Sequence, residues 1–157
     1  MTANRIRLAV FVLIFAFSTP LLFAGLAQSA SNVDGMNIDV TSVERKGNVL
    51  TIKWAVKNSG SKAAEVQFSL TGELVTTYLV DEESGTKYYA LTDKEGHVLA
   101  TEHAYTGSSH GISEEIDAGQ TKRFWAKFPA PPAAVKTINI LFTNAEPVES
   151  VAITDKK

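Results

Sequence analysis

The sequence has 157 residues, with 15 basic and 17 acidic side chains, which gives a formal net charge of −2 at neutral pH. This balance argues against nucleic acid or anionic lipid as a partner, since both need a concentrated basic face. Cysteine is absent, which excludes disulfides, thiol nucleophiles, Cys-ligated metal sites and a lipidated N-terminal cysteine. A domain of this size must therefore be held together by core packing alone.

The N-terminus has the three-part layout of a secretory signal. Two arginines, Arg5 and Arg7, precede a run of uncharged, mostly aliphatic and aromatic residues at 8–17. Without those two arginines, the rest of the chain carries 13 basic and 17 acidic side chains, so the exported part is mildly acidic. A basic start followed by an apolar stretch is typical of export signals. We therefore expect the protein to be periplasmic or secreted.

The end of this segment contains the small side chains that signal peptidase requires. Gly25 and Ala27 occupy the −3 and −1 positions of a cut after residue 27, and cuts after Ser29 or Ala30 are alternatives. We predict a signal peptide at 1–27, with cleavage as late as residue 30. The competing interpretation is a retained membrane anchor, because residues 8–27 are twenty uncharged residues. Pro20 favours cleavage, after which no membrane insertion is expected.

Beyond residue 30, apolar side chains alternate with polar ones, as they do in half-buried strands. The clearest example has Leu50, Ile52, Trp54 and Val56 on one face. Turn residues separate the strand candidates, and residues 93–96 (Asp-Lys-Glu-Gly) predict a hairpin turn with glycine at positive φ. We expect strands in the ranges 36–40, 50–56, 66–70, 74–80, 86–91, 97–101, 124–128, 135–142 and 148–153, and an irregular stretch at 102–115.

Eight or nine short strands with turns every 8–12 residues indicate an all-β domain, either a sandwich or a barrel. We predict a single antiparallel, immunoglobulin-like β-sandwich at 31–157, without a linker or repeat. Trp54 lies on the apolar face of the most regular strand, so we expect it in the core. No pattern in the sequence specifies an oligomeric state.

Three stretches carry a resemblance to a known group. They are residues 48–60, a strand ending in an Asn-Ser-Gly turn; residues 88–99 (YYALTDKEGHVL), where aromatic residues lead into a hairpin; and residues 118–132 (AGQTKRFWAKFPAPP). Together they resemble the bacterial extracytoplasmic immunoglobulin-like domains of the DUF4352-like group. The resemblance implies a β-sandwich that serves as an interaction or scaffold module, and it transfers no functional residue. Many relatives are anchored by a lipidated cysteine or a neighbouring domain, and this chain has neither.

We therefore expect a non-catalytic binding or scaffold domain of the cell envelope, without a cofactor. Its partner would be another envelope or extracellular protein, contacted through an exposed strand edge or through the 102–115 loop. No catalytic residues are assigned. Ser108, Ser109 and His110 lack the strained nucleophile elbow that a serine hydrolase needs. The acidic residues 81–83 lack the ligand spacing of an EF-hand and are expected to form a solvated turn.

A metal-binding protein is the first alternative. The candidates in the 102–117 loop are His103, His110 and Glu114, with further carboxylates nearby at Glu102, Glu115 and Asp117, because imidazole and carboxylate groups bind zinc or copper. Their spacing matches no established ligand pattern, so ordinary loop residues are the competing interpretation.

A binder of small ligands or carbohydrates is the second alternative. Trp125 is out of phase with Phe124, Ala126 and Phe128, so a large aromatic ring is expected on the outer face of that strand. We predict that an exposed aromatic patch forms from Trp125, Tyr88, Tyr89 and Tyr105. Such patches grip proteins or sugars, although a sandwich can also wrap an edge over them.

Overall fold

The computed structural model describes residues 26–71, 77–101, 104–105 and 111–157, with only the backbone described at 104–105. Within these residues the chain forms twelve strands and no helix, so none of them belongs to a membrane-spanning helix. The strands are β1 (Ala27–Ala30), β2 (Met36–Lys46), β3 (Val49–Asn58), β4 (Ala64–Ser69), β5 (Tyr78–Asp81), β6 (Thr86–Tyr89), β7 (Ala104–Tyr105), β8 (Gly111–Ile116), β9 (Thr121–Pro129), β10 (Thr137–Leu141), β11 (Val148–Ala152) and β12 (Thr154–Asp155).

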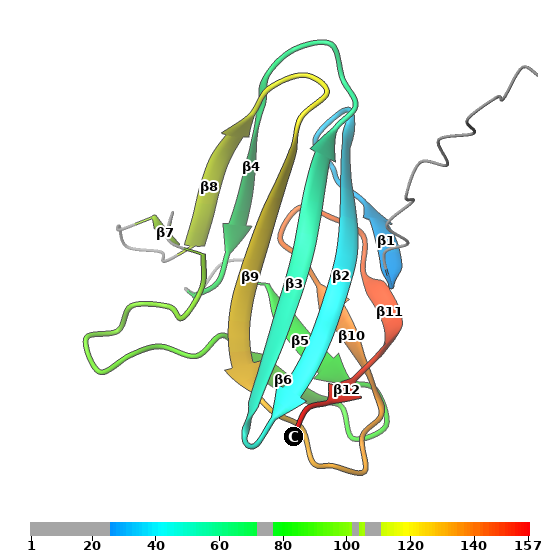
Figure 1. Cartoon of the computed structure of the whole chain (residues 1–157), viewed down its shortest axis with the longest axis vertical. Helices are drawn as coiled ribbons and strands as arrows, with labels where there is room; N and C mark the ends of the chain where they lie inside the picture. The colour runs from blue at the N-terminus through cyan, green and yellow to red at the C-terminus, as the bar shows by residue number, and fades with distance from the viewer. Residues whose placement is uncertain (1–25, 72–76, 102–103, 106–110) are drawn as a thin grey trace, which may run out of the picture.

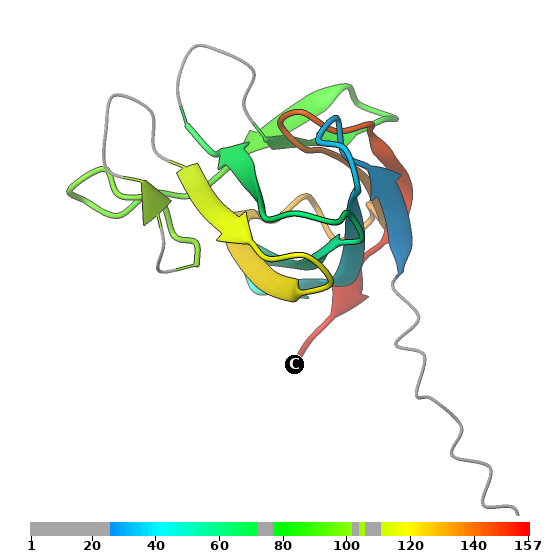
Figure 2. The same ribbon diagram turned by 90° about the horizontal axis from the view of Figure 1, so that it is seen from above.

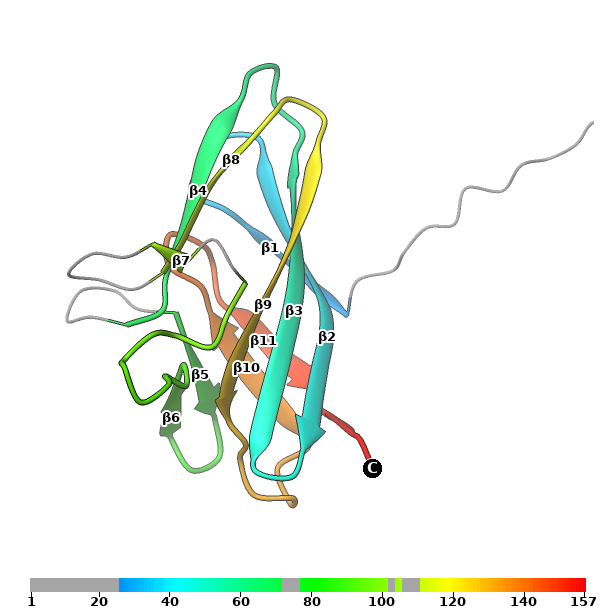
Figure 3. The ribbon, with the colours of Figure 1, turned by 60° about the vertical axis from the view of Figure 1, so that its left-hand side comes forward.

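The predicted all-β sandwich is confirmed. One layer is the sheet β1-β2-β3-β9, whose long strands run along the molecule, with β12 added parallel to β2 (Figure 1). The opposite layer has two parts, the sheet β4-β8-β7 and the sheet β11-β10-β5-β6 (Figure 3). All other strand pairs are antiparallel. Seen from above, the layers surround a common interior (Figure 2).

The large sheet is built from a hairpin whose turn depends on one glycine. Gly47 has a φ of 58°, and it joins β2 to β3 at the pair Lys46↔Val49. Backbone with positive φ is strained for residues that carry a Cβ, so glycine fixes this tight turn. The alternation of side chains then places one face of β2 and β3 in the interior, as the sequence predicts.

The core centres on Trp54, as expected. Its side chain is 1% exposed, and its ring lies 5.3 Å from both Phe68 and Phe142 and 5.9 Å from Phe124, measured between centroids. Such offset aromatic contacts add to the stabilisation from area burial. Because these rings come from both layers, the cluster joins the large sheet to the opposite side of the sandwich.

The first strand fastens the two layers at one side. The Oγ of Ser29 donates to the carbonyl of Glu146 at 2.5 Å, and the Glu146 amide donates to the carbonyl of Ala30 at 3.1 Å. On its other side β1 pairs with β2 from Ala27↔Val40 to Ala30↔Asn37. Ser29 is itself buried, at 7% exposure. Residues 27–30 are therefore an integral part of the sandwich.

Arg45 fastens the opposite end of the large sheet. This residue is 5% exposed. Its Nη1 donates to the carbonyls of Pro131 and Pro132, its Nη2 to that of Val135, and its Nε to Asp155 at 2.6 Å. A buried guanidinium is stable only when its donors are satisfied in this way. Arg45 thus joins β2, the proline-rich turn and the C-terminal strand.

Two sequence-based predictions of strands need correction. Residues 97–101 form only isolated bridges, and β6 pairs with β5 instead of with them. Within the stretch 102–115, predicted to be irregular, residues 111–115 belong to the regular strand β8. Part of the predicted strand at 74–80 falls outside the described residues, and β1 spans the range in which the cut after residue 27, 29 or 30 is predicted. The turn at Asp93 and Gly96 is present, with the Gly96 amide donating to the Asp93 carbonyl at 3.1 Å.

A candidate binding edge on strand β4

Among the strands that the structure describes, β4 pairs only with β8. It runs beside β8 in six consecutive antiparallel pairs, from Ala64↔Ile116 to Ser69↔Gly111, without a bulge. Val66 and Phe68 face the core and are buried, while Glu65 and Gln67 alternate with them and are exposed. The strand therefore forms an edge of its sheet.

The backbone of Ser69 shows which polar groups point away from β8. Its amide donates to Thr143 Oγ1 at 3.1 Å, and its carbonyl accepts the Thr77 amide at 2.6 Å. The N–H and C=O of one residue in a strand point to the same side, and this side alternates along the strand. The backbone groups of Gln67 and Glu65 therefore point to the same outer edge, where no described residue hydrogen-bonds to them.

Other strand edges in the described part of the sandwich are blocked, distorted or short. The edge of β9 is covered by a chain segment, because the Leu91 amide donates to the Lys127 carbonyl at 2.8 Å and the Lys127 amide donates to the Leu99 carbonyl at 2.9 Å. β11 is irregular where Ser150 takes a φ of 53°. β6 has four residues and presents Lys87. Covering, bulges and short charged edges all discourage strand pairing.

The outer face of β4 and β8 contains a hollow of ≈ 370 Å³, bounded by Glu65, Gln67 and Ser69 on β4 and by Gly111 and Ser113 on β8. Gly111 is essential to this shape. A Cβ at that position would lie 2.4 Å from the Phe68 carbonyl oxygen, a distance that real Cβ atoms do not adopt. Because position 111 has no side chain, the hollow reaches down to the strand backbone.

The charge beside this hollow is negative. Glu65 accepts hydrogen bonds from Ser113 Oγ and from Gln67 Nε2, and the bond from Ser113 lowers the pKa of the Glu65 carboxyl below its ordinary value. Glu115, which is also exposed, is the cross-strand partner of Glu65. The β4 edge therefore presents the Glu65 carboxylate, whose lowered pKa favours the ionised form, beside backbone groups that have no described hydrogen-bond partner.

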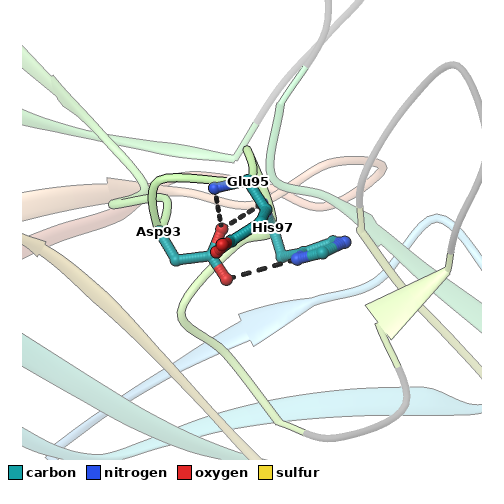
Figure 4. Close-up of side chains that lie close together, drawn as sticks. All are labelled: Asp93, Glu95 and His97. Atoms are coloured by element: carbon teal, nitrogen blue, oxygen red, sulfur yellow. Dashed lines mark hydrogen bonds and ion pairs between the residues drawn. The ribbon is translucent and has the colours of Figure 1, made fainter.

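The residues predicted to bind metal are only partly placed. His103 and His110 lie outside the described residues, as do Ser108 and Ser109. Glu114 forms an ion pair with Lys122, and its side chain is 16% exposed. Among the described residues, one group has the donor types and proximity of a metal site: Asp93, Glu95 and His97 (Figure 4). A histidine that directly follows the Asp-Lys-Glu-Gly turn was the sequence signal for this group.

The acidic turn at 81–83 is not fully solvated as predicted. Asp81 is 7% exposed, and its carboxylate accepts the Glu83 amide at 3.2 Å and the Ser84 hydroxyl at 2.6 Å. These bonds are typical of an aspartate that stabilises a turn through its own side chain. The residue therefore has a structural role at the end of β5.

The predicted aromatic residues face different parts of the molecule. Tyr88 pairs across the strands with buried Leu79 and packs against the core, and burial raises the pKa of its phenol. Tyr89 points to the opposite face, is 53% exposed, and lies 5.8 Å from the Tyr78 ring. Trp125 is half-buried on β9 of the large sheet, and the side chain of Tyr105 is not described.

The edge beside Trp125 is partly wrapped by the preceding segment. The Trp125 amide donates to Thr101 Oγ1 at 2.8 Å, and the Thr101 amide donates to the Trp125 carbonyl at 2.9 Å. On the outer face, Lys127 Nζ lies 5.8 Å from the centroid of the indole ring. Trp125 therefore has contacts of its own in the fold, and the described aromatic residues do not form a single patch.

No family model, no curated protein and no solved structure matches this chain.

Proposed function

We propose that this chain is an exported, non-catalytic binding or scaffold domain of the bacterial cell envelope, similar in role to the DUF4352-like domains. It acts by pairing an extended segment of another envelope or extracellular protein with the outer edge of β4. The observation that carries this proposal is the pair of residues Glu65 and Gln67, whose backbone groups point outward without a described hydrogen-bond partner. The export signal at 1–27 supports a periplasmic or secreted location.

Strand addition suits this edge for two physical reasons. Glu65 and Gln67 together offer two amide donors and two carbonyl acceptors, so an added strand gains backbone hydrogen bonds whatever its sequence. The adjacent hollow, whose depth depends on Gly111, receives a side chain and supplies selectivity. The regular register of β4 keeps these groups evenly spaced along the edge.

The test compares two substitutions at Gln67 in the native host. Gln67→Ala removes the side chain but retains the amide, whereas Gln67→Pro removes the outward donor and places a ring at the edge. With a photoreactive residue at position 65, we expect the same partner to cross-link in the wild type and the Ala variant. The Pro variant should lose that cross-link while its melting temperature stays within a few degrees.

The proposal fails if a folded Gln67→Pro variant keeps every cross-linked species. If that variant does not fold, amide exchange decides the matter on the wild type. The Gln67 amide should exchange rapidly in the free protein and become protected in the presence of the captured partner. An amide that is already protected in the free protein, or one that the partner leaves unprotected, rejects strand addition at β4.

A further inference from the structure

The turn that follows β6 is held in shape by one carboxylate oxygen. Asp93 Oδ1 accepts the amide of Glu95 at 3.0 Å and the amide of His97 at 2.8 Å. The Asp93 amide donates to the His97 carbonyl at 2.8 Å, and Gly96 adopts a φ of 88° between them. These bonds bring residues 93 and 97 side by side, and they explain why the sequence Asp-Lys-Glu-Gly-His closes a tight loop here.

The second oxygen of the same carboxylate takes no part in these backbone bonds. Asp93 Oδ2 instead faces His97 Nδ1 at a distance of 3.2 Å, and the Glu95 carboxylate lies beside them (Figure 4). One ligand atom from each of the three residues lies within 4.8 Å of the others, and all three side chains are exposed. The fold therefore holds one imidazole nitrogen and two carboxylates close together at a place that an ion can reach from solvent.

We propose that Asp93, Glu95 and His97 form a binding site for a divalent transition-metal ion, Cu²⁺ or Zn²⁺. Bonds from zinc to nitrogen and oxygen ligands are about 2.0–2.2 Å long. Two neighbouring ligand atoms at such distances are separated by roughly 3.0–3.4 Å in octahedral or tetrahedral geometry. The observed 3.2 Å between Asp93 Oδ2 and His97 Nδ1 falls in this range. The two atoms therefore already have the separation that a shared ion requires.

The donor set selects the kind of ion. Imidazole favours copper, zinc and nickel, whereas calcium and magnesium prefer sites made only of oxygen ligands. Copper should bind more tightly than zinc, following the general order for nitrogen and oxygen ligands. Three protein ligands leave further coordination positions to water, so the expected site is an open surface site. This inference uses residues away from the β4 edge and does not depend on the proposed strand addition.

Two local interactions compete with the ion. Nδ1 of His97 lies within hydrogen-bond distance of Asp93 Oδ2, and this contact must open before the nitrogen can coordinate an ion. The ammonium of Lys94 lies 3.4 Å from Glu95 Oε1, and it offsets part of the negative charge. Lys94 is therefore a position at which a substitution should strengthen binding without touching a ligand.

The experiment titrates the purified exported protein with CuSO₄, ZnCl₂ and CaCl₂ by calorimetry, and follows the histidine ring signals by NMR in the zinc arm. We expect one equivalent of zinc to shift the His97 ring signals, tighter binding of copper, and no response to calcium at the same concentration. Asp93→Asn retains an oxygen that accepts both turn amides but loses the charge. It should therefore weaken binding by about tenfold or more while the turn stays folded, as should His97→Ala.

Lys94→Gln supplies the matched control, since it leaves all three ligands in place and should tighten binding by about twofold to threefold. A second control is the double variant His103→Ala/His110→Ala, which should bind as the wild type does. The proposal is overturned if zinc at millimolar concentration leaves the His97 ring signals unchanged. It is equally overturned if the His97→Ala variant binds normally while the double variant does not, because the ion would then belong to the other histidines.

Discussion

The large sheet and the small β4-β8-β7 sheet differ in how far their strands are paired and their edges covered. β2 and β3 are paired over ten positions, and the free side of β9 is covered by the segment at 91–101. β4 and β8 are paired over six, and β4 has an outer edge without a described partner. The comparison teaches that the two regions share one core, since β4 supplies Phe68 to the aromatic cluster around Trp54. They differ in the covering of their edges: the free side of β9 is closed by another segment, and the outer side of β4 has no described strand beside it.

The largest effect should come from opening the core behind the large sheet. Trp54→Ala removes the ring that contacts both layers, and we expect it to lower the free energy of unfolding by about 4 kcal/mol. Trp125→Ala, on the outer face of the same sheet, should cost less than about 1 kcal/mol because its ring is only half-buried. Urea unfolding of both variants checks this. Equal losses would show that the outer face is as important to stability as the core.

The next largest effect should come from Arg45, at the end of the large sheet. Arg45→Met leaves the carbonyls of Pro131, Pro132 and Val135 without their donor, so we expect a loss of about 3 kcal/mol in unfolding free energy. Arg123→Met, at an exposed position in the same sheet, should change it by less than about 0.5 kcal/mol. Urea unfolding measures both. If the two variants lose the same amount, the stabilising role of the buried guanidinium is wrong.

A smaller and more local effect is expected in the small sheet. Gly111→Ala forces a Cβ against the Phe68 carbonyl, and the resulting shift of β8 should cost about 2 kcal/mol. Hydrogen exchange should show faster exchange at the Val66 and Phe68 amides, which face β8, while the amides shared by β2 and β3 keep their protection. Ser113→Ala serves as the control, since it leaves the strand pairing intact. Loss of protection across both sheets would mean that the two regions unfold as one unit.

The smallest effect concerns the pH dependence of the Arg45–Asp155 pair. The hydrogen bond from Arg45 lowers the pKa of Asp155 below its ordinary value of 3.8. A carboxyl with a lowered pKa in the folded state stabilises the protein fully above its ordinary value, and this stabilisation is lost as pH falls through the lowered value. The difference in melting temperature between wild type and Asp155→Asn should therefore be constant from about pH 5 to 7 and shrink below about pH 4.

The Arg45→Met background checks the cause of this dependence. Without the guanidinium, Asp155→Asn should have a much smaller effect, because only the exposed Lys136, at 3.5 Å, remains beside the carboxylate. A difference of undiminished size in that background, or one that grows as the pH falls, would assign the effect to another group.

Much of the fold was predictable because the large sheet obeys simple alternation. Leu50, Ile52, Trp54 and Val56 are all buried, as their spacing predicts. β8 was missed because Glu114 occupies a position where alternation expects an apolar residue, and its ion pair with Lys122 can be recognised only when β9 is in place. The pairing of β6 with β5 was missed because the Asp93 turn suggested residues 97–101 as the partner, while the polar residues 81–85, which join β5 to β6, were interpreted only as the end of the preceding strand.

The candidate sites were harder to predict, for two different reasons. Which strand lies at an open edge depends on how the sheets assemble, and no local pattern around Glu65 or Gln67 records it. The sequence alone could have predicted that Tyr88 and Tyr89 do not share a patch, since neighbours in a strand point to opposite faces. The turn that holds the proposed metal ligands at 93–97 was likewise predictable from the sequence. The arrangement of its side chains depends on the backbone hydrogen bonds to Asp93, which the sequence does not show.

Strand β1 lies at the predicted signal-cleavage site, so the position of the cut would determine how much of this strand remains. Cleavage after Ala27, the expected position, leaves Gln28, Ser29 and Ala30 to fasten the two layers. Cleavage after Ala30 instead removes the whole strand and uncovers one flank of β2. If the predicted signal is cleaved, the choice of scissile bond therefore sets whether β1 covers the flank of β2, so a shift of three residues would change which strand edges the sandwich exposes.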